Sequence, residues 1–173
     1  MISELNRLKQ DKSIQCIVGT YNPELHGIPF ISLASFFETP VDKLPILLTT
    51  HKEENISQFN FEAMYEYLSE QMPELDMYGI KKILTKIIAK IKKITNGISI
   101  NQEIGLLMHI SSAIYRIQTE QSLPENVRKL QIITQNKILY HDLKEIILPL
   151  EEYYYIHFSD DEIAHIIFMI KEL

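Results

Sequence analysis

The stretch IKKILTKIIAKIKKI, residues 80–94, decides the fold. Its isoleucines and its one leucine recur at the i, i+3, i+4, i+7 spacing, which predicts an amphipathic α-helix. Lysines fill most of the positions between them and form the face expected to lie in solvent. Asn96-Gly97 follows directly, and this pair is typical of a helix end.

The helical period continues on both sides of this stretch, through most of residues 59–173. Ser159-Asp160-Asp161-Glu162 has the pattern of a capping box, with acidic residues that favour a helix start. The other helices are expected over Phe59–Leu68, ending near Pro73, over Ile104–Ile117, from Pro124 through Ile133, and over Leu143–Leu150, which Pro149 is expected to kink or end. The pattern predicts an all-α bundle of five to six helices.

Residues 1–58 differ in composition from residues 59–173. Four of the seven prolines and two of the five glycines lie there. Ile14–Val18 and Ile28–Leu33 predict two short strands, and Leu33–Phe37 predicts the start of a helix that Pro40 limits. We therefore expect a short irregular extension over residues 1–58 and a helical domain over 59–173.

Composition and motifs exclude several functional classes. The net charge of -6 comes without a basic face, which argues against nucleic-acid binding by this chain. A single cysteine, Cys16, fits a reducing compartment, and no apolar stretch is long enough for a membrane span, so we expect a cytoplasmic protein. Phosphate loops, nucleophile elbows and paired metal ligands are all missing. We expect no enzyme, no metal and no cofactor.

His109 lies in the middle of a predicted helix and differs from the other five histidines in its neighbours, most of which are small. Gly105 lies one turn before it, and the small residues Ser112 and Ala113 lie one turn after it. A glycine inside a helix costs about 1 kcal/mol relative to alanine, so it needs a reason. Close approach of another helix is one reason, and access of a partner to the imidazole is another. The spacing leaves open a packed structural histidine, a proton switch and a phosphoryl acceptor.

Three segments around this helix resemble the phosphotransferase-system (PTS) regulation domain, abbreviated PRD. MHISSAIYRI, residues 108–117, is similar to its first histidine motif. LKEIILPLE, residues 143–151, and IHFSDDEIA, residues 156–164, resemble its closing helices. The match runs over roughly residues 60–173 in the expected order. This resemblance implies an all-helical regulatory domain without enzymatic activity.

Two segments upstream of residue 59 indicate which type of PRD-containing protein the chain resembles. IVGTYNP, residues 17–23, and GIPFISL, residues 27–33, are similar to the segment before the last PRD of large sigma-54-dependent activators of sugar-uptake operons. In those activators the segment trails a domain that resembles a IIB transporter component. The resemblance implies that residues 1–58 are the tail of such a IIB-like segment plus a linker, and that the chain is the C-terminal part of a longer protein.

The resemblance also implies how the domain works. A PTS protein, either a IIB component or a histidine-containing phosphocarrier, would phosphorylate His109. The phosphoryl group adds roughly -1.5 to -2 charges, by analogy with phosphoserine, and would retune helix packing or a homodimer. Arg116, two turns further along the same face, is the residue expected to respond to the phosphate.

Two positions depart from the family pattern. Met169 occupies the place of a second histidine in the last helix, so a second phosphorylation there is not expected. His165, one turn earlier, is either a secondary acceptor or a plain surface histidine. Tyr115 replaces the usual acidic residue before the motif arginine, so an acid–imidazole contact from that position is absent. Two other functions stay open: a purely structural dimerisation module and the regulatory domain of an RNA-binding antiterminator, which the acidic charge disfavours.

Overall fold

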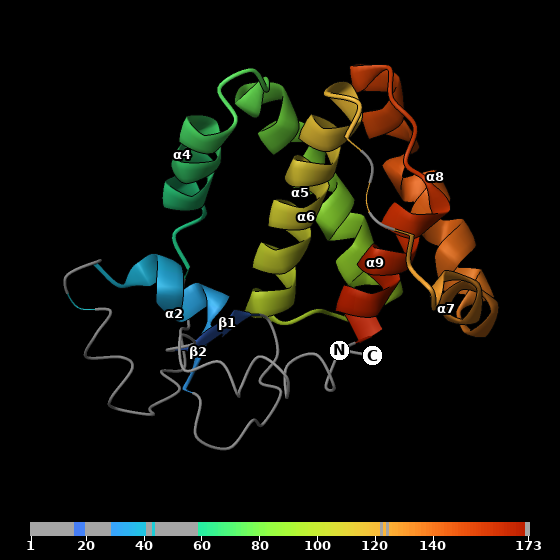
Figure 1. Ribbon diagram of the computed structural model, residues 1–173, viewed down its shortest axis with the longest axis horizontal. Coiled ribbons are helices and arrows are strands. Elements are labelled where there is room, and N and C mark those ends of the chain that lie inside the picture. Colours follow the sequence, from blue (N-terminus) through green and yellow to red (C-terminus); the bar gives the residue numbers. More distant parts are fainter. Residues whose placement is uncertain are drawn as a thin grey trace.

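The computed structural model describes residues 16–19, 29–40, 43, 59–121, 123 and 125–171. Helices dominate these residues, as the sequence predicts, and two short strands precede them (Figure 1). The described elements are β1 (Ile17–Gly19), β2 (Phe30–Ser32), α2 (Leu33–Glu38), α4 (Phe61–Gln71), α5 (Met77–Ile94), α6 (Ile100–Gln118), α7 (Lys129–Gln135), α8 (Lys137–Tyr154) and α9 (Asp160–Lys171).

The helix predicted over residues 80–94 is α5, which lies at the centre of the bundle. Asp76 caps its first turn by accepting a hydrogen bond from the Gly79 N–H. Asn96 and Gly97 both have positive φ, so the predicted stop at this pair is confirmed. Figure 1 shows α4 on one side of α5 and α6, and α8 and α9 on the other.

A single hydrophobic core runs through α2 and the six later helices. Phe158, between α8 and α9, is its largest fully buried side chain. Each fully buried apolar side chain contributes about 1.5–3 kcal/mol relative to its exposed state, so the core is the main source of stability. The residues of α5 and α6 that it buries include Ile80, Leu84, Ile87, Ile91, Ile104, Leu106, Ile110 and Ile114.

The described part of the extension packs against the first turn of α6. β1 and β2 pair in parallel, and α2 begins at Ser32, whose side chain caps it. The Ala34 N–H donates at 3.2 Å to the Oδ1 of Asn101 on α6, and Ala34 is buried in the core. The extension therefore touches the same helix that carries His109.

Two of the predicted helix limits are wrong. Of the two effects expected of Pro149, a kink or an end, the end is wrong: α8 continues to Tyr154, because Ile146, Ile147 and Leu150 are buried on both sides of the exposed proline and hold the helix in the core. α7 begins at Lys129 and not near Pro124, which lies outside the described residues.

The late start of α7 has a local cause. The Asn126 N–H donates to Asp161 on α9, and the Asn126 side chain accepts from the Arg128 N–H, so this stretch forms a turn rather than a first helical turn.

Candidate functional site

Polar contacts at both ends hold α6 and α9 together as antiparallel neighbours. At the start of α6, the Gln102 side chain completes a capping box with Ser99 and donates to the carbonyls of Met169 and Ile170 at the end of α9. Further along α6, His109 and Arg116 reach Glu162 in the first turn of α9. The pairing of these two helices therefore brings residues 102–116 and 162–170 into one site.

Glu162 lies between the two α6 side chains that the sequence singles out. Its Oε2 is 3.0 Å from Nε2 of His109, an ion-pair distance at which the N–H direction is off the line of a good hydrogen bond. Nη2 of Arg116 donates to Oε1 at 2.9 Å and to Oε2 at 3.2 Å. His109 and Arg116 thus share a face and a single carboxylate.

All three side chains are largely removed from solvent. The side chain of Glu162 is 4% exposed, that of His109 15% and that of Arg116 21%. Burial opposes the charged form of Glu162, but the close contact with His109 and the hydrogen bonds and charge of Arg116 outweigh it and hold the pKa of this carboxyl below its ordinary value. The carboxylate is therefore ionised at neutral pH and provides a fixed negative charge beside the imidazole.

Glu162 is the site residue that sequence reasoning missed. The sequence Ser159-Asp160-Asp161-Glu162 predicts a capping box with two hydrogen bonds. One of them is present, since the Glu162 N–H donates to Ser159 Oγ at 3.4 Å. The side chain does not return to the cap but turns to His109 and Arg116. With Tyr115 at the usual acidic position, the acid–imidazole contact comes instead from another helix.

His165 is the second histidine that the structure brings to this site. Its ring centroid is 5.7 Å from that of His109, with the ring planes tilted by 37°. The side chain is half-buried, in contrast to a plain surface histidine. Burial is the main cause that lowers its pKa, and the positive charges of His109 and Arg116 add to the effect. At neutral pH His165 is therefore an uncharged imidazole beside His109.

Comparison with known protein families identifies the family of the domain that contains this site. The family model of the PRD domain matches residues 81–173, which is more than half of the chain and contains the whole site. The chain belongs to the PRD domain family. It is therefore a regulatory domain of the PTS-controlled type, in a family that is not enzymatic and whose members interact with PTS components. No curated protein and no solved structure matched the chain.

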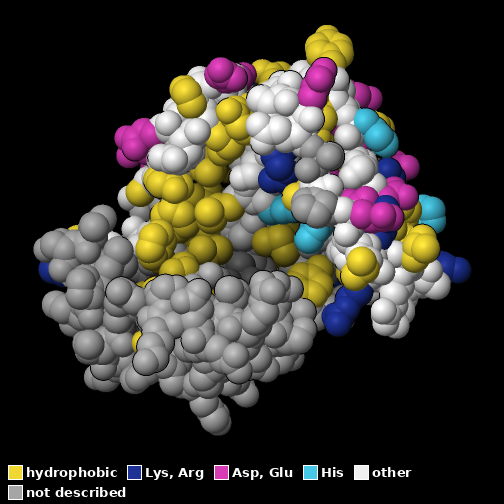
Figure 2. Space-filling view, viewed as in Figure 1, with side chains coloured by type: hydrophobic (Ala, Val, Ile, Leu, Met, Phe, Trp, Pro, Cys, Tyr) yellow, Lys and Arg dark blue, Asp and Glu magenta, His cyan; other side chains and the backbone are white. Residues whose placement is uncertain are grey.

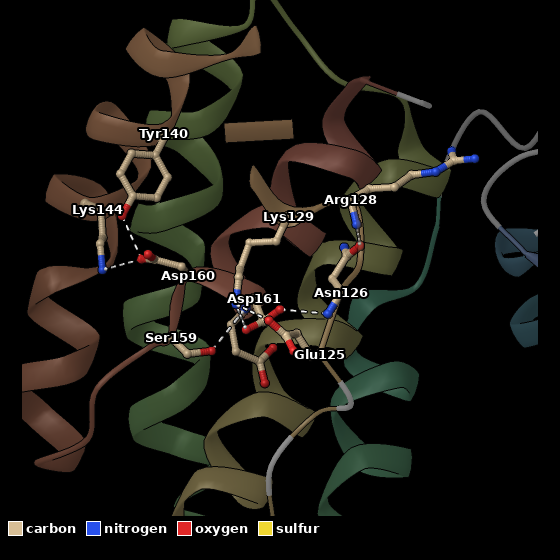
Figure 3. A network of polar contacts seen from close by, with 10 residues as sticks. Glu125, Asn126, Arg128, Lys129, Tyr140, Lys144, Ser159, Asp160 and Asp161 are labelled. Carbon is tan, nitrogen blue, oxygen red and sulfur yellow. Dashed lines mark hydrogen bonds and ion pairs between the residues drawn. The ribbon is translucent and has the colours of Figure 1, made fainter. Parts of the chain in front are cut away.

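The first turn of α9 connects three other helices through three consecutive acids, and Figure 3 shows the contacts of the first two, Asp160 and Asp161. Asp160 accepts from the Tyr140 hydroxyl of α8 at 2.7 Å, a bond that raises the pKa of Tyr140 to about 12. Asp161 accepts from Lys129 of α7 at 2.8 Å, and this bond is the main cause that lowers the pKa of Asp161. Glu162 completes the series by contacting α6.

The remaining PRD histidines lie away from this site. His141 is exposed on α8, and His157 is 75% exposed with Nδ1 3.1 Å from Oε1 of Glu151, so both are surface residues as expected. His26 and His51 lie outside the described residues. Met169, at the place of the family's second histidine, packs against the core.

Part of the site stays exposed, since the side chain of His109 is 15% exposed and that of Arg116 21%. Figure 2 shows histidine side chains in a hollow near the middle of one face, beside Lys or Arg side chains and next to a band of hydrophobic side chains.

Within the described ranges, no cluster of His, Cys, Asp and Glu has the geometry of a metal site. No helix among those residues is long and apolar enough to cross a membrane.

Proposed function

We propose that His109 is the phosphoryl acceptor of this PRD and that its phosphorylation controls a bacterial transcriptional activator. The observation that carries the proposal is the His109–Glu162–Arg116 arrangement inside the matched region. An imidazole that is partly exposed and oriented by a carboxylate is a nucleophile at neutral pH. The donor would be a PTS protein, either a IIB component or a histidine-containing phosphocarrier.

Phosphorylation would act on the ion pairs around Glu162. A phosphoryl group brings roughly -1.5 to -2 charges, which repel a carboxylate in contact with the same ring and attract Arg116. The guanidinium is suited to this exchange because its Nε is buried without an acceptor among the described residues. Arg116 would then leave Glu162 for the phosphate, and the first turn of α9 would lose this ion pair with α6.

The expected consequence is a change in helix packing or in homodimerisation. α9 packs on α6, α7 and α8, so a shift of its first turn would change its packing against all three helices. Such a shift would alter the association of the domain with a second copy of the chain.

Incubation with phosphoenolpyruvate and the PTS phosphoryl-transfer proteins tests the acceptor. We expect acid-labile, alkali-stable phosphate on the wild-type chain and no labelling of His109→Ala beyond slow residual labelling of His165. His141→Ala is the matched control, because it removes an exposed histidine outside the site. Equal labelling of His109→Ala and wild type would refute the proposal.

His165 is proposed as a secondary acceptor only in the absence of His109. Its uncharged ring lies next to His109, within reach of the same donor. Slow residual labelling of His109→Ala that disappears in the His109→Ala/His165→Ala double variant is the expected result. Labelling that persists in the double variant would place the second site elsewhere.

We also propose a context for this domain. The helical unit from residue 59 onward would be the last PRD of a cytoplasmic, sigma-54-dependent activator, and residues 1–58 the tail of a IIB-like segment plus a linker. The parallel β1–β2 pair and the packing of α2 on α6 agree with a folded upstream segment. Coding sequence for an ATPase and transporter-like domains upstream of Met1 would support this context.

One observation favours a second function, a structural dimerisation module. Nε2 of His109 is enclosed beside Glu162, and Met169 replaces the family's second histidine, so an inert site is the alternative. Sedimentation equilibrium of wild type and His109→Asp distinguishes the two. Unchanged association in both the phosphorylated chain and the variant would favour the structural module.

A further inference from the structure

The two ring nitrogens of His109 have different surroundings. Nε2 is enclosed and faces the Glu162 carboxylate at 3.0 Å, so the exposed 15% of the side chain belongs to its other atoms. Nδ1 is separated from Nε2 by the Cε1 carbon, and no described residue hydrogen-bonds to it. One nitrogen is therefore occupied, and the other is available to a partner.

The charge on Glu162 decides which nitrogen carries the proton in the neutral ring. With the proton on Nε2, an N–H faces the carboxylate. With the proton on Nδ1, an Nε2 lone pair would face a buried anion at 3.0 Å, and the two would repel each other while Nε2 stayed without a donor. The tautomer of an imidazole follows the partner of its other nitrogen, so the Nε2–H form is favoured.

We infer that Glu162 is a positioning residue that holds the proton on Nε2 and thereby directs the phosphoryl group to Nδ1 of His109. The inference rests on the proposed function for the phosphoryl step, but the assignment of the tautomer stands without it. Arg116 contributes by fixing the carboxylate from the other side, through hydrogen bonds to both of its oxygens.

The transfer step balances without any further reactant. The Nδ1 lone pair attacks the phosphorus of a phosphohistidine or phosphocysteine on the donor protein. The new P–N bond forms as the donor's P–N or P–S bond breaks, and the electron pair of that bond stays with the donor. The ring gains positive charge, and its Nε2 proton, which faces Glu162, is stabilised there or passes to the carboxylate.

Nitrogen NMR of the intact, unphosphorylated chain tests the tautomer directly. Long-range correlation of ring protons with ¹⁵N distinguishes a protonated nitrogen from an unprotonated one, at about pH 8.5, where imidazole is ordinarily neutral. We expect protonated Nε2 and unprotonated Nδ1 for His109 in the wild type. An Nδ1–H form in the wild type overturns the inference.

Glu162→Gln keeps the shape of the side chain but removes its charge, so it is the informative variant. We expect a mixed tautomer for His109 and a phosphorylation rate lower by roughly 10- to 100-fold. Glu151→Gln is the matched control, because Glu151 contacts the exposed His157 at 3.1 Å and not His109. A pure Nε2–H tautomer that persists in Glu162→Gln overturns the role of the carboxylate.

Phosphorus NMR of the phosphorylated chain then identifies the nitrogen. Phosphorus on Nδ1 couples to one ring proton, Hε1, whereas phosphorus on Nε2 couples to both Hε1 and Hδ2. We expect coupling to Hε1 alone, and coupling to both protons overturns the inference. Failure to incorporate phosphate at all would instead refute the proposed function, while the tautomer measurement would still decide the role of Glu162.

Discussion

Arg116 and Glu162 meet between α6 and α9, where Nη2 of the guanidinium donates at 2.9 Å to Oε1 of the carboxylate. The side chain of Arg116 is 21% exposed and that of Glu162 is 4% exposed. Little water is therefore available to solvate either charge if its partner is removed. Removal of one member of such a pair leaves the other buried and uncompensated, which is more costly than the net worth of the intact pair.

Glu162→Ala is therefore expected to lower the free energy of unfolding by about 3 kcal/mol at neutral pH. Glu162→Gln keeps an acceptor for Arg116, so its loss is smaller, about 1–2 kcal/mol. Urea denaturation followed by circular dichroism measures both values. Glu62→Ala is the control, because its pair with Lys81 is exposed and is worth less than about 1 kcal/mol. Equal losses at the two glutamates would contradict the structural role of Glu162.

Two groups at the site make the fold less stable in acid. The pKa of Glu162 is lowered from 4.5, so its contribution is present above that value and is lost as the pH falls through the folded pKa. The pKa of His165 is lowered from 6.5, so the unfolded chain binds this proton first and stability falls as the pH drops below 6.5.

Urea midpoints between about pH 7 and pH 3 measure these two effects. His165→Gln is expected to flatten the decline just below 6.5, and Glu162→Gln to flatten the decline below 4.5. Asp161, whose pKa Lys129 lowers, acts in the same acidic range, so the difference between variant and wild type is the quantity to compare. Parallel profiles for the wild type and Glu162→Gln would show that folding does not lower the pKa of Glu162.

Pro149→Ala is expected to stabilise the domain by about 1–3 kcal/mol. Proline is about 3 kcal/mol less favourable than alanine inside a helix, and α8 continues through this exposed position. Thermal unfolding by calorimetry measures the gain. Destabilisation would mean that the packing of Ile146 and Leu150 depends on the local bend that proline introduces.

Periodicity predicted the helices whose buried faces repeat along the chain. α5 and α6 were expected from their isoleucines, and the Asn96-Gly97 stop was expected from local backbone preference. The two wrong limits have non-local causes. Burial on both sides of Pro149 extends α8, and Asp161, 35 residues away in sequence, holds the Asn126 backbone in a turn.

The site was predictable only in part for the same reason. His109 and Arg116 are seven residues apart on one helix, so their shared face follows from the helical repeat. The role of Glu162 does not, because a glutamate three residues after Ser159 fits a local capping box equally well. Only the antiparallel pairing of α6 and α9 turns its side chain toward His109 instead.

The last prediction concerns the first turn of α9. Its three acids contact α8, α7 and α6 in succession, so a phosphate that draws Arg116 away from Glu162 removes one of the three connections. Hydrogen exchange should then accelerate several-fold at the amides of residues 161–165 and at 126–129, whereas the centre of α5 stays protected. The same treatment applied to His109→Ala should leave exchange unchanged. If exchange also accelerates in His109→Ala, or does not accelerate in the phosphorylated wild type, then phosphorylation of His109 does not destabilise α9 through Arg116.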